Sequence, residues 1–401
     1  MRIWIISQFV VPQRYGFGSR QCSMAESLVR LGHAVTVIGP AKNHLFALPF
    51  TPDKPFQRET FRGVDYCWLP FPRLANRYNA ARLFAWLIFL GKLWNFPWQR
   101  LEAPDHILYS SPSLLPGLIM LHLARRFPHA KRWLDIRDLW PLSLRCLTGM
   151  RPNHPLYRLL NAIEKHLLRH SHAVITVMPN AGAYLSRQAG RPLSVHWIPH
   201  GLDPHLHEAP QTATALDPLL PEASFIVVYA GAMGRANDVQ NLAEAAAMLE
   251  KNPDANGIHF LMVGGGEALE ALQAQAASRT NLSVWPALPR HEIMPLLAQC
   301  HLAYDGFPDC HLYQHGFSRN KWVDYAMAGL PIVAAYRGYP NMIDLAGCGR
   351  NIPPGDPKEL ARVILDFSNM PDAQRRTIGR RGFDVVRQYR AYDAMLKPLF
   401  R

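Results

Sequence analysis

Short apolar runs alternate with amphipathic segments along most of this chain, and this alternation restricts the fold more than any other feature. The largely apolar run Ile3–Val10 is typical of a parallel strand that is covered on both faces. Apolar residues then follow with helical spacing over Ser19–Leu31, and Gly32 ends this segment. A second apolar run covers residues 33–39. These residues predict a β-loop-α-β unit at the start of the chain.

The same pattern continues and then restarts in the second half. Further N-terminal strands are expected at His106–Ser110, Arg132–Asp135, Ala173–Val177 and Val195–Ile198. C-terminal strands are expected at 225–231, 259–266, 282–287, 301–307 and 331–335, with helices at Val239–Glu250, Glu267–Ala277, His291–Gln299 and Lys321–Ala328. Two consecutive α/β halves predict two Rossmann-like, doubly wound domains that face a cleft.

The boundary between these domains is expected between Gly201 and Pro221, a stretch rich in proline, alanine and threonine. We therefore predict an N-terminal domain over residues 1–205 and a C-terminal domain over residues 206–385. A final helix over residues 386–401 is expected to pack back on the N-terminal domain.

Positive charge is concentrated in the first half. Residues 1–200 hold 25 Lys and Arg against 9 Asp and Glu, a net charge of +16, and the remainder holds 18 against 21, a net charge of −3. These values add up to the +13 of the whole chain. A basic half favours an anionic partner such as a phosphorylated substrate, a membrane or a nucleic acid, although a merely soluble basic surface is the alternative.

One basic, aromatic segment, Arg77–Arg100, suits the membrane interface because tryptophan and phenylalanine lie between Arg and Lys. It is shorter and less uniformly apolar than the roughly 20-residue stretch that spans a bilayer. A buried helix with a basic outer side is the alternative, and the two are compatible. The opening residues lack a cleavage site for a signal peptide, so we expect a cytoplasmic protein.

Glycines follow three of the expected strands. Gly16 and Gly18 precede the first helix, Gly234 and Arg235 precede the helix at Val239, and the run Gly264–Gly266 precedes Glu267. Such turns let a backbone approach a ligand, and the following helix N-terminus suits phosphate. Arg235 is placed to neutralise a diphosphate. Plain tight turns explain these glycines equally well.

The segment His315–Ala335 carries the strongest chemical pattern. Lys321 and Asp324 are three residues apart and share one face of the expected helix. A lysine suits a phosphate and a carboxylate suits ribose hydroxyls, while a surface ion pair is the alternative. His311 and His315 have no second ligand pair beside them, so no metal site is predicted.

The whole chain resembles the family-four retaining glycosyltransferases of the GT-B fold. The opening strand, glycine loop and helix, the "RDLWP" of Arg137–Pro141, the "IPHGLD" of Ile198–Asp203, "GGGE" and "FSRNKWVDYAMAGLPIVA" fall in the order of that family. The similarity is nearest to bacterial enzymes of cell-surface polysaccharide assembly. It implies a nucleoside diphosphate sugar as donor, either a UDP-sugar or a GDP-sugar. The expected donor is of the UDP-N-acetylhexosamine type.

Carried over position by position, the resemblance implies that Asp324 binds the donor ribose, as the second acidic residue of the family's Glu-x7-Glu signature. The first acidic position falls on Gly316. The family's arginine and lysine after the first glycine align with Ala232 and Asn237, and we expect Arg235 and Lys321 to replace them.

The other expected roles complete the site. Asp138 is the candidate beside the reacting sugar, and the catalytic set is Asp138, Arg235 and Lys321. The donor-binding set is Gly16, Gly18, Gly234, Gly264, Gly265, Gly266, Glu267 and Asp324. Acceptor binding is assigned to Arg137, Arg77 and Tyr78. No cofactor and no metal are required on this view, because cationic side chains and helix N-termini stabilise the leaving diphosphate.

The expected acceptor is a polyprenyl-diphosphate-linked or other glycan. We expect a peripheral protein at the inner face of the cell membrane, where it also contacts anionic lipids. A nucleotide-sugar epimerase is the alternative enzyme. The basic, aromatic N-terminal half argues against it, because an epimerase has no lipid-linked acceptor. A nucleic-acid-binding protein is a second alternative, but the chain shows no recognisable binding module, so no nucleic acid partner is expected.

Overall fold

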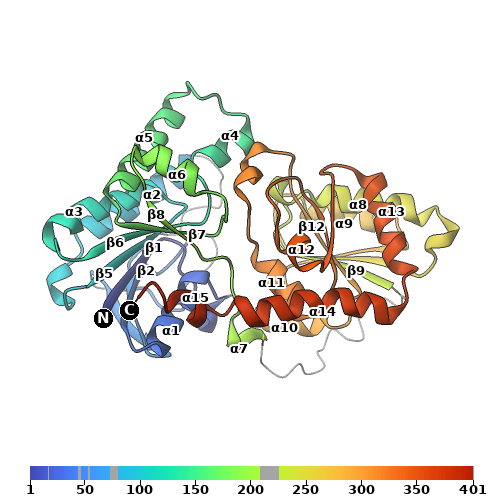
Figure 1. The fold of residues 1–401 in the computed structure, drawn as a ribbon, viewed down its shortest axis with the longest axis horizontal. Helices are drawn as coiled ribbons and strands as arrows, with labels where there is room; N and C mark the ends of the chain where they lie inside the picture. The colour runs from blue at the N-terminus through green and yellow to red at the C-terminus, as the bar shows by residue number, and fades with distance from the viewer. Residues whose placement is uncertain (17, 44–46, 53–54, 73–79, 208–224, 401) are drawn as a thin grey trace. The chain divides into compact units, whose positions relative to one another are not determined.

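The computed structural model of this chain describes residues 1–16, 18–43, 47–52, 55–72, 80–207 and 225–400 (Figure 1). The chain divides into two compact units. The N-terminal unit consists of Met1–Pro199 with Tyr392–Arg401, and the C-terminal unit consists of His200–Ala391. The division therefore falls after Pro199 rather than after residue 205, which the sequence had suggested.

The N-terminal unit is built on an eight-stranded sheet with the strand order β3-β4-β2-β1-β5-β6-β7-β8. Its strands are β1 (Arg2–Ser7), β2 (Ala34–Pro40), β3 (Gln57–Phe61), β4 (Val64–Leu69), β5 (His106–Ser110), β6 (Lys131–Ile136), β7 (Ala173–Thr176) and β8 (Ser194–Trp197). All neighbours pair in parallel except β3 and β4. The central strand β1 pairs with β2 through Ile3 and Val35, and with β5 through Ile3 and His106.

The hairpin of β3 and β4 was not predicted. Strand β3 is polar and largely exposed at the edge of the sheet, so it lacks the apolar run that marks the central strands. The turn between the two strands is formed by Arg62 and Gly63, which have φ angles of 50° and 75°. Glycine adopts this left-handed region readily.

Helices cover both faces of this sheet. They are α1 (Arg20–Arg30), α2 (Ala80–Trp94), α3 (Ile119–Arg126), α4 (Leu142–Thr148), α5 (Pro155–His170), α6 (Gly182–Ala189) and α15 (Tyr392–Leu396). In Figure 1, α1 and α15 lie on one side of the sheet, and α3, α5 and α6 lie on the other. Because side chains alternate along a strand, Ile3 and Ile5 pack with α1 and α15 in one core cluster.

The C-terminal unit is built on a six-stranded, fully parallel sheet with the order β11-β10-β9-β12-β13-β14. The strands are β9 (Phe225–Ala230), β10 (Ile258–Val263), β11 (Leu282–Trp285), β12 (Leu302–Gly306), β13 (Ile332–Ala335) and β14 (Gly349–Ile352). Strands β9 and β12 are buried along their whole length. This burial explains the continuously apolar sequence of β9, whereas β12 carries one buried carboxylate, Asp305.

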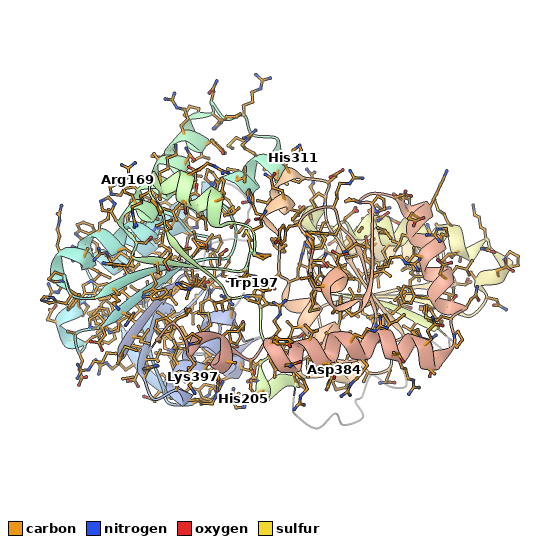
Figure 2. All side chains as sticks on the ribbon, in the orientation of Figure 1. Arg169, Trp197, His205, His311, Asp384 and Lys397 are labelled. Carbon is orange, nitrogen blue, oxygen red and sulfur yellow. The ribbon has the colours of Figure 1, made fainter. Side chains whose placement is uncertain are left out.

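The helices of this unit are α7 (Pro204–His207), α8 (Val239–Glu250), α9 (Leu269–Ala276), α10 (Arg290–Leu297), α11 (Asn320–Met327), α12 (Met342–Ala346), α13 (Pro357–Ser368) and α14 (Asp372–Tyr389). Helices α8, α9 and α13 contribute to one core cluster with β9, β10 and β12. Helices α10, α11 and α14 lie on the opposite side of the sheet (Figure 1). Charged side chains such as Arg169, Asp384 and Lys397, labelled in Figure 2, are exposed.

The two sheets and their covering helices confirm the prediction of two Rossmann-like α/β domains. In each unit, parallel strands bring the loops that follow them to one edge of the sheet. Ligands of open α/β sheets bind at this carboxyl edge.

The end of the chain differs in detail from the expected helix over residues 386–401. Helix α14 ends at Tyr389 within the C-terminal unit, and the separate short helix α15 belongs to the N-terminal unit. Phe400 is only 3% exposed there. Its ring lies 5.3 Å from that of His106 and 5.1 Å from that of Trp133, between ring centroids. The aromatic contact fastens the end of the chain to β5 and β6.

Helix α2 is apolar on two opposite faces. Trp86, Phe89 and Leu93 are buried, and the Trp86 ring packs edge-on against Trp140 with 5.5 Å between centroids. On the other face, Phe84 and Trp94 are each 56% exposed and Leu87 is 54% exposed. The expected acceptor residues Arg77 and Tyr78 lie outside the described residues.

The packing of Phe400 predicts that Phe400→Ala destabilises the N-terminal unit by about 3 kcal/mol, because a buried aromatic ring is lost and a cavity remains. Thermal unfolding checks this against Tyr389→Ala, which truncates an aromatic side chain that is 60% exposed. The control is expected to change stability by no more than about 0.5 kcal/mol. Equal melting temperatures for the two variants would contradict the packing role of the C-terminal segment.

Candidate functional site

Two glycine turns interlock at the carboxyl edge of the C-terminal sheet. The turn after β9 and the turn after β10 are joined by hydrogen bonds from the Gly231 amide to the Val263 carbonyl, 2.9 Å, and from the Met233 amide to the Gly265 carbonyl, 2.8 Å. A Cβ atom on Gly264 would lie 1.7 Å from the Gly231 carbonyl oxygen. A side chain at this position would therefore separate the two turns.

Gly266 is restricted in the same way, because its Cβ would lie 2.3 Å from the Met233 carbonyl oxygen. Gly265 has more room, with the Ala287 side chain 3.9 Å from its Cβ position. Packing alone thus accounts for Gly264 and Gly266, as the tight-turn alternative states. Donor binding by the three glycines remains a prediction.

Arg235 and Glu267 lie together in a surface hollow that Gly234 also lines. The Arg235 side chain is 90% exposed and its Nε lies 3.9 Å from Glu267 Oε1, which also accepts the Arg235 backbone N–H at 3.2 Å. Arg235 follows β9 in a short 3-10 helix (Arg235–Asn237). Its exposed guanidinium is open to a ligand but is not held in place by other side chains.

Lys321 has a different environment. Its Nζ contacts Asp305 Oδ1 at 3.1 Å, donates to the Tyr229 hydroxyl at 3.0 Å and lies 4.1 Å from the centre of the Tyr229 ring. The same Nζ is 2.9 Å from the position of a Cβ on Gly231. Helix α11 therefore places the ammonium group directly beside the glycine turn at the ends of β9 and β12.

Burial lowers the pKa of Lys321 to about 8, although Asp305 acts in the opposite direction. The pKa of Tyr229 is raised well above its usual value, chiefly by burial, so its hydroxyl stays neutral. Lys321 consequently carries its charge below about pH 8 and loses it as the pH rises further.

Asp324, on the same helix, contacts the Arg290 guanidinium and the His207 imidazole. Its Oδ1 contacts Arg290 Nη2 at 2.5 Å and His207 Nε2 at 2.9 Å, and its side chain is 8% exposed. Burial would raise the pKa of Asp324, but Arg290 and His207 outweigh this effect and hold the pKa well below its usual range. Ribose binding by Asp324 remains a prediction. The alternative, a surface ion pair of Lys321 with Asp324, is not what the structure shows, because each side chain is buried against a different partner.

Sequence reasoning missed Asp305 and Arg319. Asp305 is fully buried at the end of β12, and Arg319, which precedes α11, contacts it at 3.5 Å through Nε. A lone carboxylate in the apolar run of β12 was the available signal. Arg319 also contacts the side-chain oxygen of Asn237, the position that aligns with the family's lysine.

Gly316, at the position of the family's first acidic residue, has a φ angle of 79°. Residues with a side chain are strained in this left-handed region, so glycine suits the local backbone. The turn closes the short 3-10 helix His311–His315.

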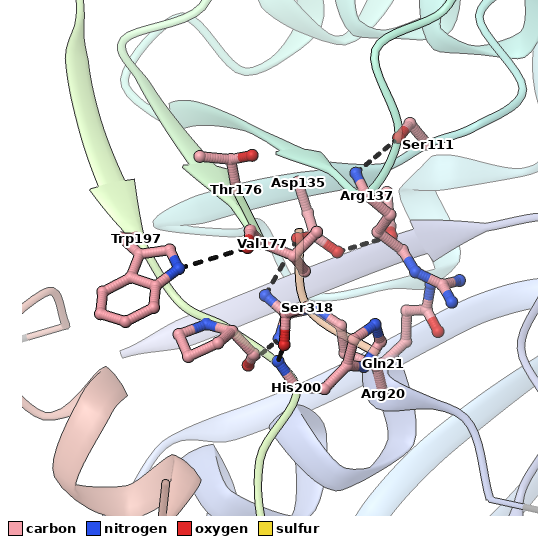
Figure 3. A network of polar contacts seen from close by, with 12 residues as sticks. Arg20, Gln21, Ser111, Asp135, Arg137, Thr176, Val177, Trp197, His200 and Ser318 are labelled. Carbon is pink, nitrogen blue, oxygen red and sulfur yellow. Dashed lines mark hydrogen bonds and ion pairs between the residues drawn. The ribbon is translucent and has the colours of Figure 1, made fainter. Parts of the chain in front are cut away.

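In the N-terminal unit, a buried ion pair lies at the carboxyl ends of β5 and β6 (Figure 3). Arg20 Nη2 donates to Asp135 Oδ1 at 3.2 Å, and both side chains are fully buried. Ser110 Oγ donates to Asp135 Oδ2 at 2.7 Å and accepts from Gln21 Nε2 at 2.8 Å. These residues fix the first turn of α1 against the sheet.

The predicted residues Arg137 and Asp138 follow β6 directly. The Arg137 backbone N–H donates to Ser111 Oγ at 3.0 Å, and its half-buried side chain has no hydrogen-bond partner for Nε among the described residues. Asp138 Oδ2 accepts from the Trp140 indole at 3.0 Å, and burial raises the pKa of Asp138. Both lie at the ligand-binding edge of their sheet, where their acceptor and catalytic roles remain predictions.

Gly16 and Gly18 lie in the loop before α1. A Cβ on Gly16 would lie 2.6 Å from a methyl group of Val11, and Gly18 has a φ angle of 68°. The loop closes through the Ser19 amide, which donates to the Val11 carbonyl at 2.7 Å. Local packing explains both glycines, and their donor contact stays a prediction.

Among the described residues, no group of three His, Cys, Asp or Glu side chains is arranged to hold a metal ion. Over the same residues, no helix combines the length and the apolar character that crossing a membrane requires.

Two family models match most of this chain. The glycosyl transferase 4-like domain matches residues 16–201, and the glycosyl transferases group 1 model matches residues 224–369. The chain is also 23% identical over 358 residues to the probable glycosyltransferase WbjE of Pseudomonas aeruginosa. That match covers 84% of this chain and 85% of the relative.

Solved structures share the fold over nearly the full length. One is an α,α-trehalose-phosphate synthase (UDP-forming) from Burkholderia vietnamiensis, with a TM-score of 0.71, 13% identity and coverage of 100% of this chain and 98% of the other. Another is WaaG, a glycosyltransferase involved in lipopolysaccharide biosynthesis, with a TM-score of 0.66, 14% identity and coverage of 99% and 98%.

The pairing of Asp324 predicts that Asp324→Asn destabilises the C-terminal unit by about 2 kcal/mol or more, because Arg290 loses the charge that compensates its burial. Since the pKa of Asp324 is lowered in the folded state, this contribution is present above about pH 4 and is lost as the pH falls. Urea unfolding at pH 7 checks the expectation. Asp366→Asn, which alters an exposed pair with Arg350, is the matched control. Similar stabilities of the two variants would contradict it.

Proposed function

This chain belongs to the family-four glycosyltransferases of the GT-B fold, and we propose that it is a retaining enzyme of surface-glycan synthesis. It moves a sugar, of the UDP-N-acetylhexosamine type, from a nucleoside diphosphate to a lipid-linked or polysaccharide acceptor. The placement of Lys321 carries the proposal. A lysine beside a glycine turn, at the carboxyl ends of two parallel strands, suits the diphosphate of such a donor.

Charge stabilisation of the leaving diphosphate is the main demand of the reaction. Lys321 supplies a positive charge at a fixed place, and Arg235 supplies a mobile one at the rim of the neighbouring hollow. These side chains meet the demand without a metal ion. Asp324 binds the ribose. The peptide backbone at Gly16, at Gly18 and in the Gly264–Gly266 turn approaches the donor closely.

Retention of configuration is proposed to follow a front-face route. The departing phosphate oxygen accepts the proton of the acceptor hydroxyl while the new glycosidic bond forms on the same face of the sugar. Asp138 orients hydroxyl groups of the donor or the acceptor, and Arg137 binds the acceptor. The name of the trehalose-phosphate synthase relative, which is UDP-forming, supports UDP as the nucleotide.

The acceptor is proposed to be a polyprenyl-diphosphate-linked glycan at the inner face of the cell membrane. The N-terminal unit carries most of the basic charge, and the exposed apolar face of α2, formed by Phe84, Leu87 and Trp94, suits insertion between lipid head groups. The lipopolysaccharide role of WaaG is consistent with such an acceptor. Basic groups near an anionic surface each contribute about 1 kcal/mol to attraction.

The first prediction from this proposal concerns turnover. A panel of UDP- and GDP-sugars scored for hydrolysis or transfer is expected to give UDP release from a UDP-N-acetyl sugar. Lys321→Ala and Arg235→Ala are each expected to lower kcat about 100-fold or more, because the charge that stabilises the leaving group is removed. Lys358→Ala, which removes an exposed cation on α13, is the control. Near-normal turnover in both site variants would defeat the assignment, and an epimerised nucleotide sugar without transfer would defeat the transferase proposal.

The second prediction concerns the membrane. The wild-type protein is expected to bind phosphatidylglycerol-containing vesicles at low salt and to dissociate as salt rises, because charges are screened over about 8 Å at physiological ionic strength. The triple substitution of Phe84, Leu87 and Trp94 to serine is expected to weaken sedimentation with vesicles at least about tenfold. Leu345→Ser, at an apolar residue 73% exposed in the other unit, is the control. No binding of the wild type at low salt rules out the peripheral model.

A further inference from the structure

We propose that Asp305 and Arg319 are positioning residues of the donor diphosphate site, which hold the Lys321 ammonium group and the loop after β9 in place beside the glycine turn. This inference rests on the proposed function in one respect, namely that the donor diphosphate meets Lys321. Neither residue belongs to the sites that the sequence had suggested.

Asp305 organises the cluster from the end of β12. Its side chain is fully buried, with Lys321 Nζ at 3.1 Å from Oδ1 and Arg319 Nε at 3.5 Å from Oδ2. The Gly306 amide donates to Oδ1 at 3.1 Å. Burying a carboxylate this completely costs free energy that neighbouring cations offset. Asp305 therefore fixes the ends of both basic side chains.

Arg319 joins the segment after β9 to the last residue of β12. Its Nη2 donates to the Ala236 carbonyl at 3.0 Å and to the Gly306 carbonyl at 3.4 Å, while Nη1 donates to the Asn237 side chain. The guanidinium carbon lies 4.1 Å from the centre of the Phe307 ring. Arg319 thus donates three hydrogen bonds to atoms of two separate segments. This geometry makes Arg319 a clamp on the loop that contains Arg235.

The cluster carries more positive than negative charge. Two cations, Lys321 and Arg319, share the one carboxylate of Asp305, and both cationic side chains are at most 15% exposed. The other partner of Lys321 is the neutral hydroxyl of Tyr229. Asp324 is already paired with Arg290 and His207. The surplus positive charge beside a glycine turn at the sheet edge is suited to a diphosphate.

The charged and titratable groups that face Lys321 come from three elements. Asp305 lies on β12, Tyr229 lies on β9, and Arg319 and Asp324 lie at the start of and within α11. Burial lowers the pKa of Lys321, Asp305 and Asp324 raise it, and Arg319 lowers it. Neutralising Asp305 is therefore expected to lower the pKa of Lys321 further, whereas neutralising Arg319 is expected to raise it.

The experiment compares Asp305→Asn with Arg319→Gln, two neutral variants of similar size and shape. The pH dependence of kcat/KM is measured for the donor sugar found active, since this ratio reports the ionisation of the free enzyme. We expect the wild-type activity to fall as the pH rises through about 8. The midpoint is expected to move down by about one pH unit in Asp305→Asn and up by about one pH unit in Arg319→Gln.

The clamp has a separate signature in the kinetic constants. Arg319→Gln is expected to raise the KM for the donor more than it lowers kcat at pH 7, because the loop after β9 loses its anchor. Asp366→Asn is the control for both measurements, since its side chain lies in an exposed pair on α13. If Asp305→Asn does not fold, the shift and the KM effect of Arg319→Gln decide the matter alone.

Opposite shifts of the two midpoints support the inference, because general destabilisation would not move a midpoint in opposite directions. Unchanged midpoints, or shifts in the same direction, overturn it. Loss of activity in Lys321→Ala together with unchanged midpoints rejects the inference and leaves the proposed function standing. Normal turnover in Lys321→Ala rejects the diphosphate site itself, and with it both proposals.

Discussion

The burial of a carboxylate at the end of a central strand is the constraint around which each unit is arranged. Asp135 and Asp305 are the penultimate residues of β6 and β12, and both side chains are fully buried. Removing an ionised carboxylate from water costs several kcal/mol unless a cation and hydrogen bonds compensate it. In each unit, basic side chains from another segment supply this compensation, and the helix that carries them is thereby fixed to the edge of the sheet.

The two carboxylates differ in what surrounds them. Asp135 is satisfied by one arginine, Arg20, and by the Ser110 hydroxyl, and Arg20 is itself fully buried. Arg137, which follows β6, is a second arginine close enough to interact with Asp135. Asp305 faces two cations, and its partner Lys321 has a lowered pKa because burial is not fully offset. A surplus of buried positive charge is costly in the free protein and favourable once an anion binds, and this suits the Asp305 cluster to a diphosphate.

The glycine turns show how closely structure and binding are linked at this edge. Gly264 and Gly266 are required because the backbones after β9 and β10 touch. A Cβ on Gly231 would lie 2.9 Å from Lys321 Nζ, so this glycine leaves the ammonium group room beside the backbone. In the N-terminal unit, helix α2 has one apolar face that is buried and another that is exposed. Helix α2 packs through Trp86, Phe89 and Leu93, whereas Phe84, Leu87 and Trp94 on its other face are each more than half exposed.

The sequence by itself determined the alternating α/β pattern, the two Rossmann-like units and the positions of the central strands, because buried parallel strands are continuously apolar. It also placed Lys321 and Asp324 on one helix and the glycines at the ends of strands. The polar edge strand β3 carried no such pattern and was missed. What only the tertiary structure decided is which charges meet. Asp324 pairs with Arg290 and His207, Lys321 pairs with Asp305, and Arg319 reaches Asn237 across 82 positions of sequence. The energy of a buried charge depends on its neighbours in space, and hydrophobic periodicity along the chain does not encode them.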